Sequence, residues 1–213
     1  MKRIGLISDT HGYLDPRLVE LLADVDEIWH AGDIGTLEVL RQLQSIKPVR
    51  AVWGNADGAS IRHALNPAPR VVFDADESTP TTETPKTDPF DPWPNPFAEG
   101  AANEVSKSKD EALPPDMLRF TVEGMDVLMT HIGGYPNRYA AKVKKVMIAN
   151  PPDIFVAGHS HILKVIFDPR YNALHLNPGA CGHYGIHTVR SALFFSIDGG
   201  EVKDMQVVEL GTK

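Results

Sequence analysis

The sequence is almost free of cysteine, because Cys181 is the single one among its 213 residues. One cysteine excludes an internal disulfide and any zinc cluster built from thiolates, and it fits a reducing compartment. A long hydrophobic run is also missing at the start, where Asp9 ends the apolar stretch of RIGLISD (3–9). So short a stretch predicts neither a signal-peptide core nor a membrane span. We therefore expect a cytoplasmic protein with no membrane partner.

Positive charge is sparse, and the negative charge is unevenly placed. The net charge is −7, yet residues 74–116 alone hold eleven Asp/Glu and three Lys, a balance of −8. The rest of the chain is therefore close to neutral, at +1. A protein that binds nucleic acid in general needs a basic face to meet the phosphates. The composition predicts no nucleic-acid platform.

Regular elements are predicted before the acidic segment. Apolar runs typical of buried strands cover 3–9, 27–33 and 49–55. Helical patterns lie between them, one beginning at Asp15-Pro16 and one covering 36–46. Strands that alternate with helices predict βαβ units and a parallel sheet.

The chain after the acidic segment is richer in strands. Its predicted elements are a hairpin over 117–131 turning at Glu123-Gly124, a helix over 139–149, a strand over 153–159, and four strands in the last fifty residues. No internal repeat is present. The outline is a single α/β (α+β) domain over 1–213, with two sheets and helices outside them.

The acidic segment itself, residues 74–116, is predicted to be an insertion. It holds eight of the 17 prolines, which remove hydrogen-bond donors and fix φ, so we expect an extended or loosely ordered stretch. Its aromatic residues Phe90, Trp93 and Phe97 would anchor it to the domain, the favoured reading, or to a partner. A further hypothesis makes it a lid whose charge repels long polyanions.

Polar groups able to bind metal end five of the predicted strands. They are Asp9-Thr10-His11, Gly32-Asp33, Gly54-Asn55, His131 and His159-Ser160-His161. Each alone is weak, since Gly-Asp and Gly-Asn are common turn dipeptides and Asp-x-His often caps a turn. Five in register with successive strands predict one site, because the carboxyl ends of strands in α/β sheets meet there.

The ligand types narrow the chemistry. Two carboxylates, one amide and four imidazoles form a nitrogen and oxygen set that suits manganese, iron or zinc. Seven ligands are too many for one tetrahedral ion and fit two ions that share a carboxylate, an arrangement typical of phosphate-ester hydrolysis. No convincing Ser/His/Asp or Cys/His arrangement competes with this prediction.

The ordered motifs resemble those of the calcineurin-like metallophosphoesterases, closest to the small bacterial and archaeal phosphodiesterases. They are SDTHG (8–12), HAGDI (30–34), GNAD (54–57), TH (130–131), GHSH (158–161) and NPGA (177–180). The resemblance covers nearly the whole chain outside 74–116. It implies a four-layer αββα sandwich, with two mixed sheets flanked by helices and a dinuclear site between the sheets.

The resemblance also implies a role for each ligand. Asp9, His11 and His161 would hold the first ion, Asn55, His131 and His159 the second, and Asp33 would bridge them. A metal-bound hydroxide would attack phosphorus, with Asp33, Asn55 and His131 closest to the chemistry. The cofactors implied are two divalent or trivalent ions, manganese first, with iron, zinc or nickel as alternatives.

The sequence departs from many family members at Ala56, where they carry a histidine that assists the leaving group. General acid–base assistance is typically worth about 10²–10⁴-fold in rate, so Ala56 implies a good leaving group or an acid from elsewhere. The small phosphodiesterases likewise lack this histidine. Asp57 is then expected to secure the turn.

Two loops hold candidate replacements for the histidine that is absent at position 56. His183, His187 and Tyr135 are candidate acids, and Tyr135, Arg138 and Arg190 are candidate substrate-binding residues, the arginines by clamping a phosphate oxygen. For each, a solvated loop residue is an equally good reading. Three other histidines are not expected to ligate: His30 and His175 would pack near the site, and His63 would lie on the surface.

Two alternatives to an enzyme stay open. One is a catalytically silent binding or scaffold protein, as in the retromer subunit of this superfamily, and the other is a site that only stores structural metal. Retention of both Asp9 and His11 favours catalysis, because silent relatives tend to lose ligands there. The expected partner is a small phosphoester substrate, and a homo-oligomer is left open.

Overall fold

The structure is a computed structural model that describes residues 1–65 and 113–213. Most of the predicted insertion, with Phe90, Trp93, Phe97 and the lid hypothesis, lies outside the described residues. The single domain over 1–213 with this insertion therefore stays a prediction.

Ten strands and four helices form within the described residues. Along the chain they are β1 (Lys2–Ile7), α1 (Pro16–Leu22), β2 (Glu27–His30), α2 (Leu37–Ile46), β3 (Val49–Ala51), α3 (Ala59–Leu65), β4 (Met117–Val122), β5 (Met125–Thr130), α4 (Ala141–Ala149), β6 (Ile154–Val156), β7 (Lys164–Asp168), β8 (Ala173–Asn177), β9 (Val189–Asp198) and β10 (Glu201–Thr212). Every predicted element is present. Helix α3 is an addition.

The strands form two mixed sheets of five. The first sheet has the order β10-β9-β1-β2-β3, in which β1, β2 and β3 are parallel and β9 runs antiparallel to β1. The second sheet has the order β4-β5-β6-β8-β7, in which β5, β6 and β8 are parallel. The carboxyl ends of the parallel strands in each sheet therefore point the same way.

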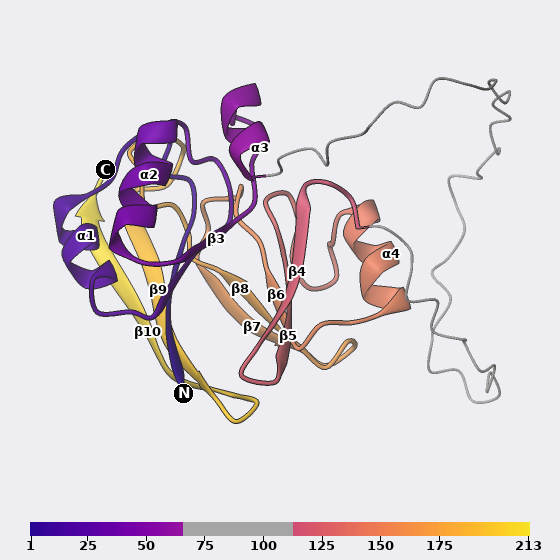
Figure 1. Cartoon of the computed structure of the whole chain (residues 1–213). Coiled ribbons are helices and arrows are strands. Elements are labelled where there is room, and N and C mark those ends of the chain that lie inside the picture. The colour runs from indigo at the N-terminus through magenta and orange to yellow at the C-terminus, as the bar shows by residue number, and fades with distance from the viewer. Residues whose placement is uncertain (66–112) are drawn as a thin grey trace, which may run out of the picture. The chain divides into compact units, whose positions relative to one another are not determined.

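Three apolar clusters hold the layers together. One lies between the sheets and includes Leu6, Trp29, Met129 and Val156. A second packs α1 and α2 on the first sheet, and a third packs α4 on the second sheet. Figure 1 shows the resulting order, with α1 and α2 on one outer side, α4 on the other, and both sheets between them. The predicted four-layer αββα sandwich is confirmed.

Local sequence explains where several elements begin and turn. Asp15 caps α1, its side chain accepting a hydrogen bond from Arg17 N, and Pro16 begins the helix. Thr36 caps α2 in the same way. Glu123 and Gly124 both have positive φ and join β4 to β5 in the predicted hairpin turn.

Within residues 1–65 and 113–213, no helix is both long and apolar enough to cross a membrane.

Candidate metal centre

The predicted ligands all lie at or just beyond strand carboxyl ends, on loops that are tied together. Asp9 N donates to Gly32 O (3.0 Å) and His11 N donates to Asp33 O (3.0 Å), which joins the loops after β1 and β2. His159 N, in the loop after β6, donates to Asp9 Oδ2 (3.1 Å). This last bond links the second sheet to the first at the site.

The backbone at these positions is strained. Nine non-glycine residues in the described ranges have positive φ, and five of them are predicted ligands: Asp9 (56°), His11 (48°), Asp33 (55°), His159 (65°) and His161 (55°). Residues other than glycine seldom adopt this conformation, which costs about 1–3 kcal/mol each and clusters at functional sites. The strain marks the strand ends as a site rather than as ordinary turns.

Asp9, His11 and His161 form a first group whose ligand atoms lie within 4.8 Å of one another. His161 Nε2 is 3.1 Å from Asp9 Oδ1, and His11 Nε2 is 3.9 Å from the same oxygen. The His11 nitrogen is buried and has no hydrogen-bond partner among the described residues. Leaving a buried polar atom unsatisfied is unfavourable, so this group fits a bound cation.

Ser8 orients Asp9, a contact that sequence reasoning missed. Its Oγ donates to Asp9 Oδ2 at 2.5 Å, and His159 N donates to the same oxygen. Oδ2 is thereby occupied, and Oδ1 is left to face the two histidines. The only signal in the sequence was a polar residue at the end of a buried strand.

Asp33 and His131, together with Asp9, form a second group within the same limit. His131 Nε2 lies 3.3 Å from Asp33 Oδ2 and 3.1 Å from Asn55 Oδ1. Its Nδ1 lies 2.8 Å from Ala31 O. A carbonyl only accepts, so Nδ1 carries the proton and Nε2 of the neutral ring offers a lone pair. Three acceptors then converge, which is favourable when a cation lies among them.

The charges within this second group keep the Asp33 carboxylate ionised. Burial raises the pKa of Asp33, but the hydrogen bond and charge of His131 more than offset it, so the pKa is lowered overall. Burial lowers the pKa of His131, whereas Asp33 and Asp9 raise it, with a net increase. Without a cation this increase favours a protonated ring, and a cation bound at Nε2 would displace that proton and leave the neutral, ligating form. A buried carboxylate therefore stays ionised at neutral pH and available to a metal.

His159 is placed beside these groups rather than within them. Its ring lies 5.2 Å from that of His131, edge to face, and no nitrogen of His159 belongs to either group of mutually close ligand atoms. Burial and the neighbouring His131 lower its pKa, which keeps the ring neutral. A neutral imidazole is the form that ligates metal.

The stretch Gly54-Asn55-Ala56-Asp57 combines a turn with a ligand. Asp57 is buried and accepts from Gly35 N and Gly54 N, both at 2.8 Å, so it secures the turn as predicted. A Cβ on Gly54 would lie 2.1 Å from Asp33 Oδ1, so only glycine allows this approach. Ala56 N donates to Asp33 Oδ1 (2.8 Å), and its exposed methyl group offers no proton donor.

The remaining histidines of the sequence analysis are not ligands in either group. His30 Nε2 bonds Thr10 Oγ1 (3.0 Å) and its Nδ1 accepts from Gly32 N (3.2 Å), so it supports two ligand loops, and burial lowers its pKa to about 4. His175 is buried and stacks on Phe155. His63 is exposed on α3.

Arg190 requires a correction. Its guanidinium is buried and donates to Asp15 Oδ2 (2.6 Å), Leu210 O (2.7 Å) and Thr212 O (3.4 Å). These bonds join the cap of α1 to the end of β10 and hold the guanidinium inside the fold, with Nε, Nη1 and Nη2 each bonded. The prediction that Arg190 binds substrate is wrong, and the residue is structural.

The other predicted helpers lie in exposed loops. The ring of His183 is 4.2 Å from that of Tyr13, Lys164 Nζ lies 4.8 Å from the ring of Tyr135, and Arg138 N donates to Tyr135 O (2.8 Å). These contacts are with residues outside the two ligand groups. The proposed roles of His183, Tyr135 and Arg138 stay predictions.

Tyr184 and His187 are the loop residues that reach the ligands. The ring of Tyr184, 71% exposed, lies 4.9 Å from that of His11, and sequence reasoning did not single it out. His187 Nδ1 lies 3.2 Å from His161 Nδ1. The loop after β8 therefore borders the first group.

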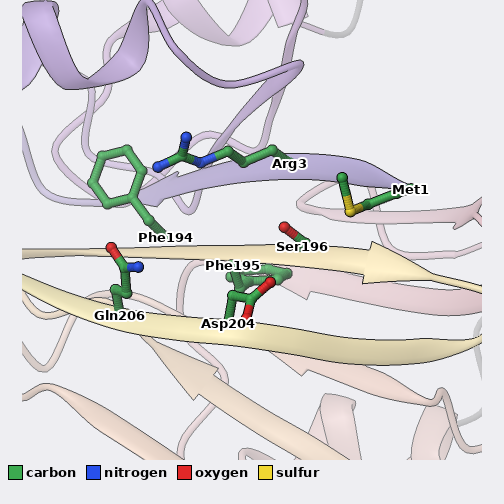
Figure 2. Close-up of a pocket in the computed structure, with 7 residues that line it drawn as sticks. All are labelled: Met1, Arg3, Phe194, Phe195, Ser196, Asp204 and Gln206. Atoms are coloured by element: carbon green, nitrogen blue, oxygen red, sulfur yellow. The ribbon is translucent and has the colours of Figure 1, made fainter.

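A hollow of about 320 Å³ lies elsewhere, on the first sheet (Figure 2). Its lining comes from β1, β9, β10 and the first residue, and includes Arg3, Phe194 and Asp204. Arg3 is six residues before Asp9, roughly 20 Å along an extended strand. The hollow contains none of the predicted ligands and plays no part in the site.

The fold and the site define a class, a two-sheet scaffold with a nitrogen and oxygen metal centre at its strand ends. A family model described as the calcineurin-like phosphoesterase superfamily domain matches residues 1–200. The chain belongs to this superfamily.

Individual relatives agree with that membership. A probable metallophosphoesterase of Methanothermobacter thermautotrophicus is 37% identical over 59 residues, 25% of this chain and 34% of the relative. The match thus spans about a third of that relative's length.

Two solved structures share the fold. One of an archaeal phosphodiesterase has a TM-score of 0.59 at 16% identity and covers 98% of this chain and 99% of that chain. Vps29 of Entamoeba histolytica in complex with Zn²⁺ has a TM-score of 0.56 at 14% identity. The match covers 97% of this chain and 98% of that chain.

Proposed function

We propose that the chain is a dinuclear metal-dependent phosphoesterase that hydrolyses small phosphodiesters. The observation that carries the proposal is the convergence of acceptors: Asp9 Oδ1, Asp33 Oδ2 and the Nε2 atoms of His131 and His161 lie in two groups that share Asp9. Such a set is unfavourable without cations and is matched in donor type to transition metals.

The ligands divide between two ions. Asp9, His11 and His161 would hold the first, Asn55, His131 and His159 the second, and Asp33 both, since its Oδ2 lies 3.7 Å from His11 Nε2 and 3.3 Å from His131 Nε2. When bound, two such ions lower the pKa of water and offset the charge that grows on the phosphoryl oxygens.

The other residues hold this arrangement in place. Ala56 N fixes Asp33 Oδ1, so the carboxylate presents Oδ2 to both histidines. The exposed ring of Tyr184 beside His11 offers a surface for the leaving group. Because Ala56 cannot donate a proton, the favoured substrates are esters with good leaving groups.

We further propose that the substrates are diesters, that the metal is manganese and that the protein acts in the cytoplasm. The likeness to an archaeal phosphodiesterase supports diesters over monoesters, although monoester hydrolysis is compatible with the same ligands. Manganese is the first choice of metal; zinc is the ion bound to Vps29 in one related structure. A small phosphoester is the proposed partner.

The alternative function is a silent binding or scaffold protein. The Vps29 structures share this fold about as closely as the phosphodiesterase does, with a TM-score of 0.56 against 0.59. We favour the enzyme because strained, mutually close ligands are typical of functional sites. Vps29 also binds Zn²⁺ in one solved structure, so turnover is the property that separates the two functions.

The test is hydrolysis of paired substrates after loading with Mn²⁺, for example p-nitrophenyl phosphate and bis(p-nitrophenyl) phosphate. We expect faster cleavage of the diester, and loss of activity in Asp33→Asn and His159→Ala. If the wild type binds two ions yet cleaves no member of a wider mono- and diester panel, the scaffold function is correct. If both variants keep full activity, the site is misassigned.

A further inference from the structure

His161, a predicted ligand of the first ion, has a side-chain partner on its far side. Its Nδ1 lies 3.2 Å from Nδ1 of His187, and the two rings meet edge to face with centroids 5.1 Å apart. The other nitrogen of His187, Nε2, lies 3.0 Å from Gly182 O. The three groups form a chain that begins at a backbone carbonyl and ends at a metal ligand.

The direction of every proton in this chain follows from its first member. A carbonyl only accepts, so Nε2 of His187 carries the hydrogen and donates to Gly182 O. In a neutral His187 ring, Nδ1 is then an acceptor. His161 Nδ1 must therefore be the donor between the rings, and His161 Nε2 is left to face Asp9 Oδ1 at 3.1 Å.

We propose that His187 is a positioning residue that fixes the tautomer and ring orientation of His161 and so aims Nε2 of His161 at the first ion. The proposal rests on the metal centre of the proposed function. It extends that centre by one residue that touches neither substrate nor metal. Partners of this kind typically change metal affinity about 10–100-fold when removed.

The loop that carries His187 is built against the site. Gly182 N donates to Asp9 O (3.1 Å), so the carbonyl that orients His187 belongs to a residue anchored on a ligand. Starting from the backbone of Asp9, the contacts pass through Gly182, His187 and His161 and return to the carboxylate of Asp9. A closed circuit of this kind holds both rings in register.

Gly185 permits the contact between the rings. It has φ of +123°, and a Cβ there would lie 2.0 Å from His161 Nδ1 and 3.2 Å from His187 Nδ1. Any side chain at this position would occupy the space where the two nitrogens meet. The loop therefore needs glycine both for its backbone conformation and for the histidine pair.

A comparison with His131 shows why the pair of His161 and His187 is sensitive to substitution. Its Nδ1 is held by Ala31 O, a backbone atom that no substitution removes, whereas His161 depends on a side chain. Substitution of His187 should thus affect one ion position and spare the other. Because both nitrogens of His187 are engaged, we assign it this positioning role in place of that of a candidate general acid.

The test compares two substitutions of His187. His187→Asn keeps an acceptor near the Nδ1 position, and His187→Leu removes it while filling a similar volume. His63→Asn, on the exposed surface of α3, is the matched control. Calorimetric titration with Mn²⁺ should show that the affinity of one of the two sites falls about 10–100-fold in His187→Leu. We expect the affinity to recover partly in His187→Asn and to stay unchanged in the control.

A second readout needs neither metal nor turnover. Long-range ¹H–¹⁵N spectra of the metal-free wild type at mildly alkaline pH should show His161 protonated at Nδ1, and this signature should disappear in His187→Leu. A wild-type His161 protonated only at Nε2 overturns the proposal, as does equal Mn²⁺ binding by wild type and His187→Leu. Failure of the proposed function would appear separately, as an intact His161 signature in a protein that cleaves no phosphoester.

Discussion

The two sheets contribute different kinds of predicted ligand to the proposed metal centre. The first sheet supplies Asp9, His11, Asp33 and Asn55, so it brings every oxygen ligand and a single imidazole. The second sheet supplies His131, His159 and His161, all imidazoles. In the proposed centre the first sheet would therefore provide the negative charge, and the second would provide imidazole nitrogens. Each of the two proposed ion positions would take ligands from both sheets.

The supports of these ligands cross between the sheets as well. His131 of the second sheet donates to Ala31 O of the first, and His159 N donates to Asp9 Oδ2. The apolar cluster between the sheets fixes their separation, while these bonds fix the orientation of the ligands. The proposed metal centre therefore depends on the packing of the two sheets against each other, and substitutions of its ligands in either sheet should disturb it.

The largest effect is expected on the oxygen side, at Asp33. Asp33→Asn removes the negative charge that both ion positions share, and metal-borne stabilisation of several kcal/mol corresponds to about 10³-fold or more in kcat/KM. Steady-state hydrolysis of a diester after Mn²⁺ loading measures it. Asp198→Asn, which changes an exposed carboxylate far along β9, should stay at the wild-type rate.

The nitrogen side is tested by comparing two histidines of the second sheet. His131 belongs to a group of close ligand atoms and His159 lies beside it, so we expect His131→Ala to lower Mn²⁺ affinity at one position by about 100-fold or more, beyond the range seen for supporting residues. His159→Ala should lower it less. Isothermal titration of both variants decides the order, and the reverse ranking would show that His159 is the stronger ligand.

Arg190, on β9 of the first sheet, tests whether a residue can stabilise the fold without taking part in substrate binding. Arg190→Gln breaks a buried pair with Asp15 and should lower the free energy of unfolding by about 3 kcal/mol. Because the residue holds α1 and β10 rather than substrate, KM should stay unchanged. Urea unfolding and steady-state kinetics measure the two quantities, and a raised KM with normal stability would restore the phosphate clamp.

Behind the second sheet, His175 predicts an effect of similar size that appears only in acid. Burial lowers its pKa to about 4 from the ordinary 6.5, and neither ring nitrogen has a hydrogen-bond partner among the described residues. The unfolded chain therefore binds a proton more readily, and stability is lost as pH falls from about 6.5 toward about 4. The full difference corresponds to about 3 kcal/mol.

His175→Phe should remove that loss while keeping the stack on Phe155. Urea unfolding over this pH range, with a chelator present so that metal release does not contribute, compares the two proteins. We expect the variant to be flatter in acid and equal or slightly more stable at neutral pH. Parallel pH profiles would show that His175 does not titrate in this way.

The sequence predicted the elements, and it predicted candidate ligands of which the structure brings five into two close groups, because both depend on local patterns. Apolar runs ending in Asp, Asn or His mark strand ends, and Glu123-Gly124 marks a turn. The order of the strands was not predictable, since the placement of β9 beside β1 and of β8 beside β6 depends on contacts between distant segments. Helix α3 is as short as α1, with seven residues, but it lacks a start signal like Asp15-Pro16 and buries only Ile61.

The roles of charged loop residues were the hardest feature to predict from the sequence. Arg138 and Arg190 look alike in sequence, yet Arg190 is committed to Asp15, 175 residues earlier in the chain. His187 looked like an acid because a histidine in a loop usually faces solvent, whereas both of its nitrogens are used by Gly182 and His161. Such assignments need the tertiary contacts.

The most direct test of the central claim is the anomalous diffraction of a crystal grown with Mn²⁺. A dinuclear centre predicts two peaks per chain, about 3.5–4 Å apart. We expect Asp33 between them, His161 and Asp9 on one, and His131 and Asn55 on the other, so that each ion joins both sheets. A single peak, or ions held by the ligands of one sheet alone, would contradict the proposed centre.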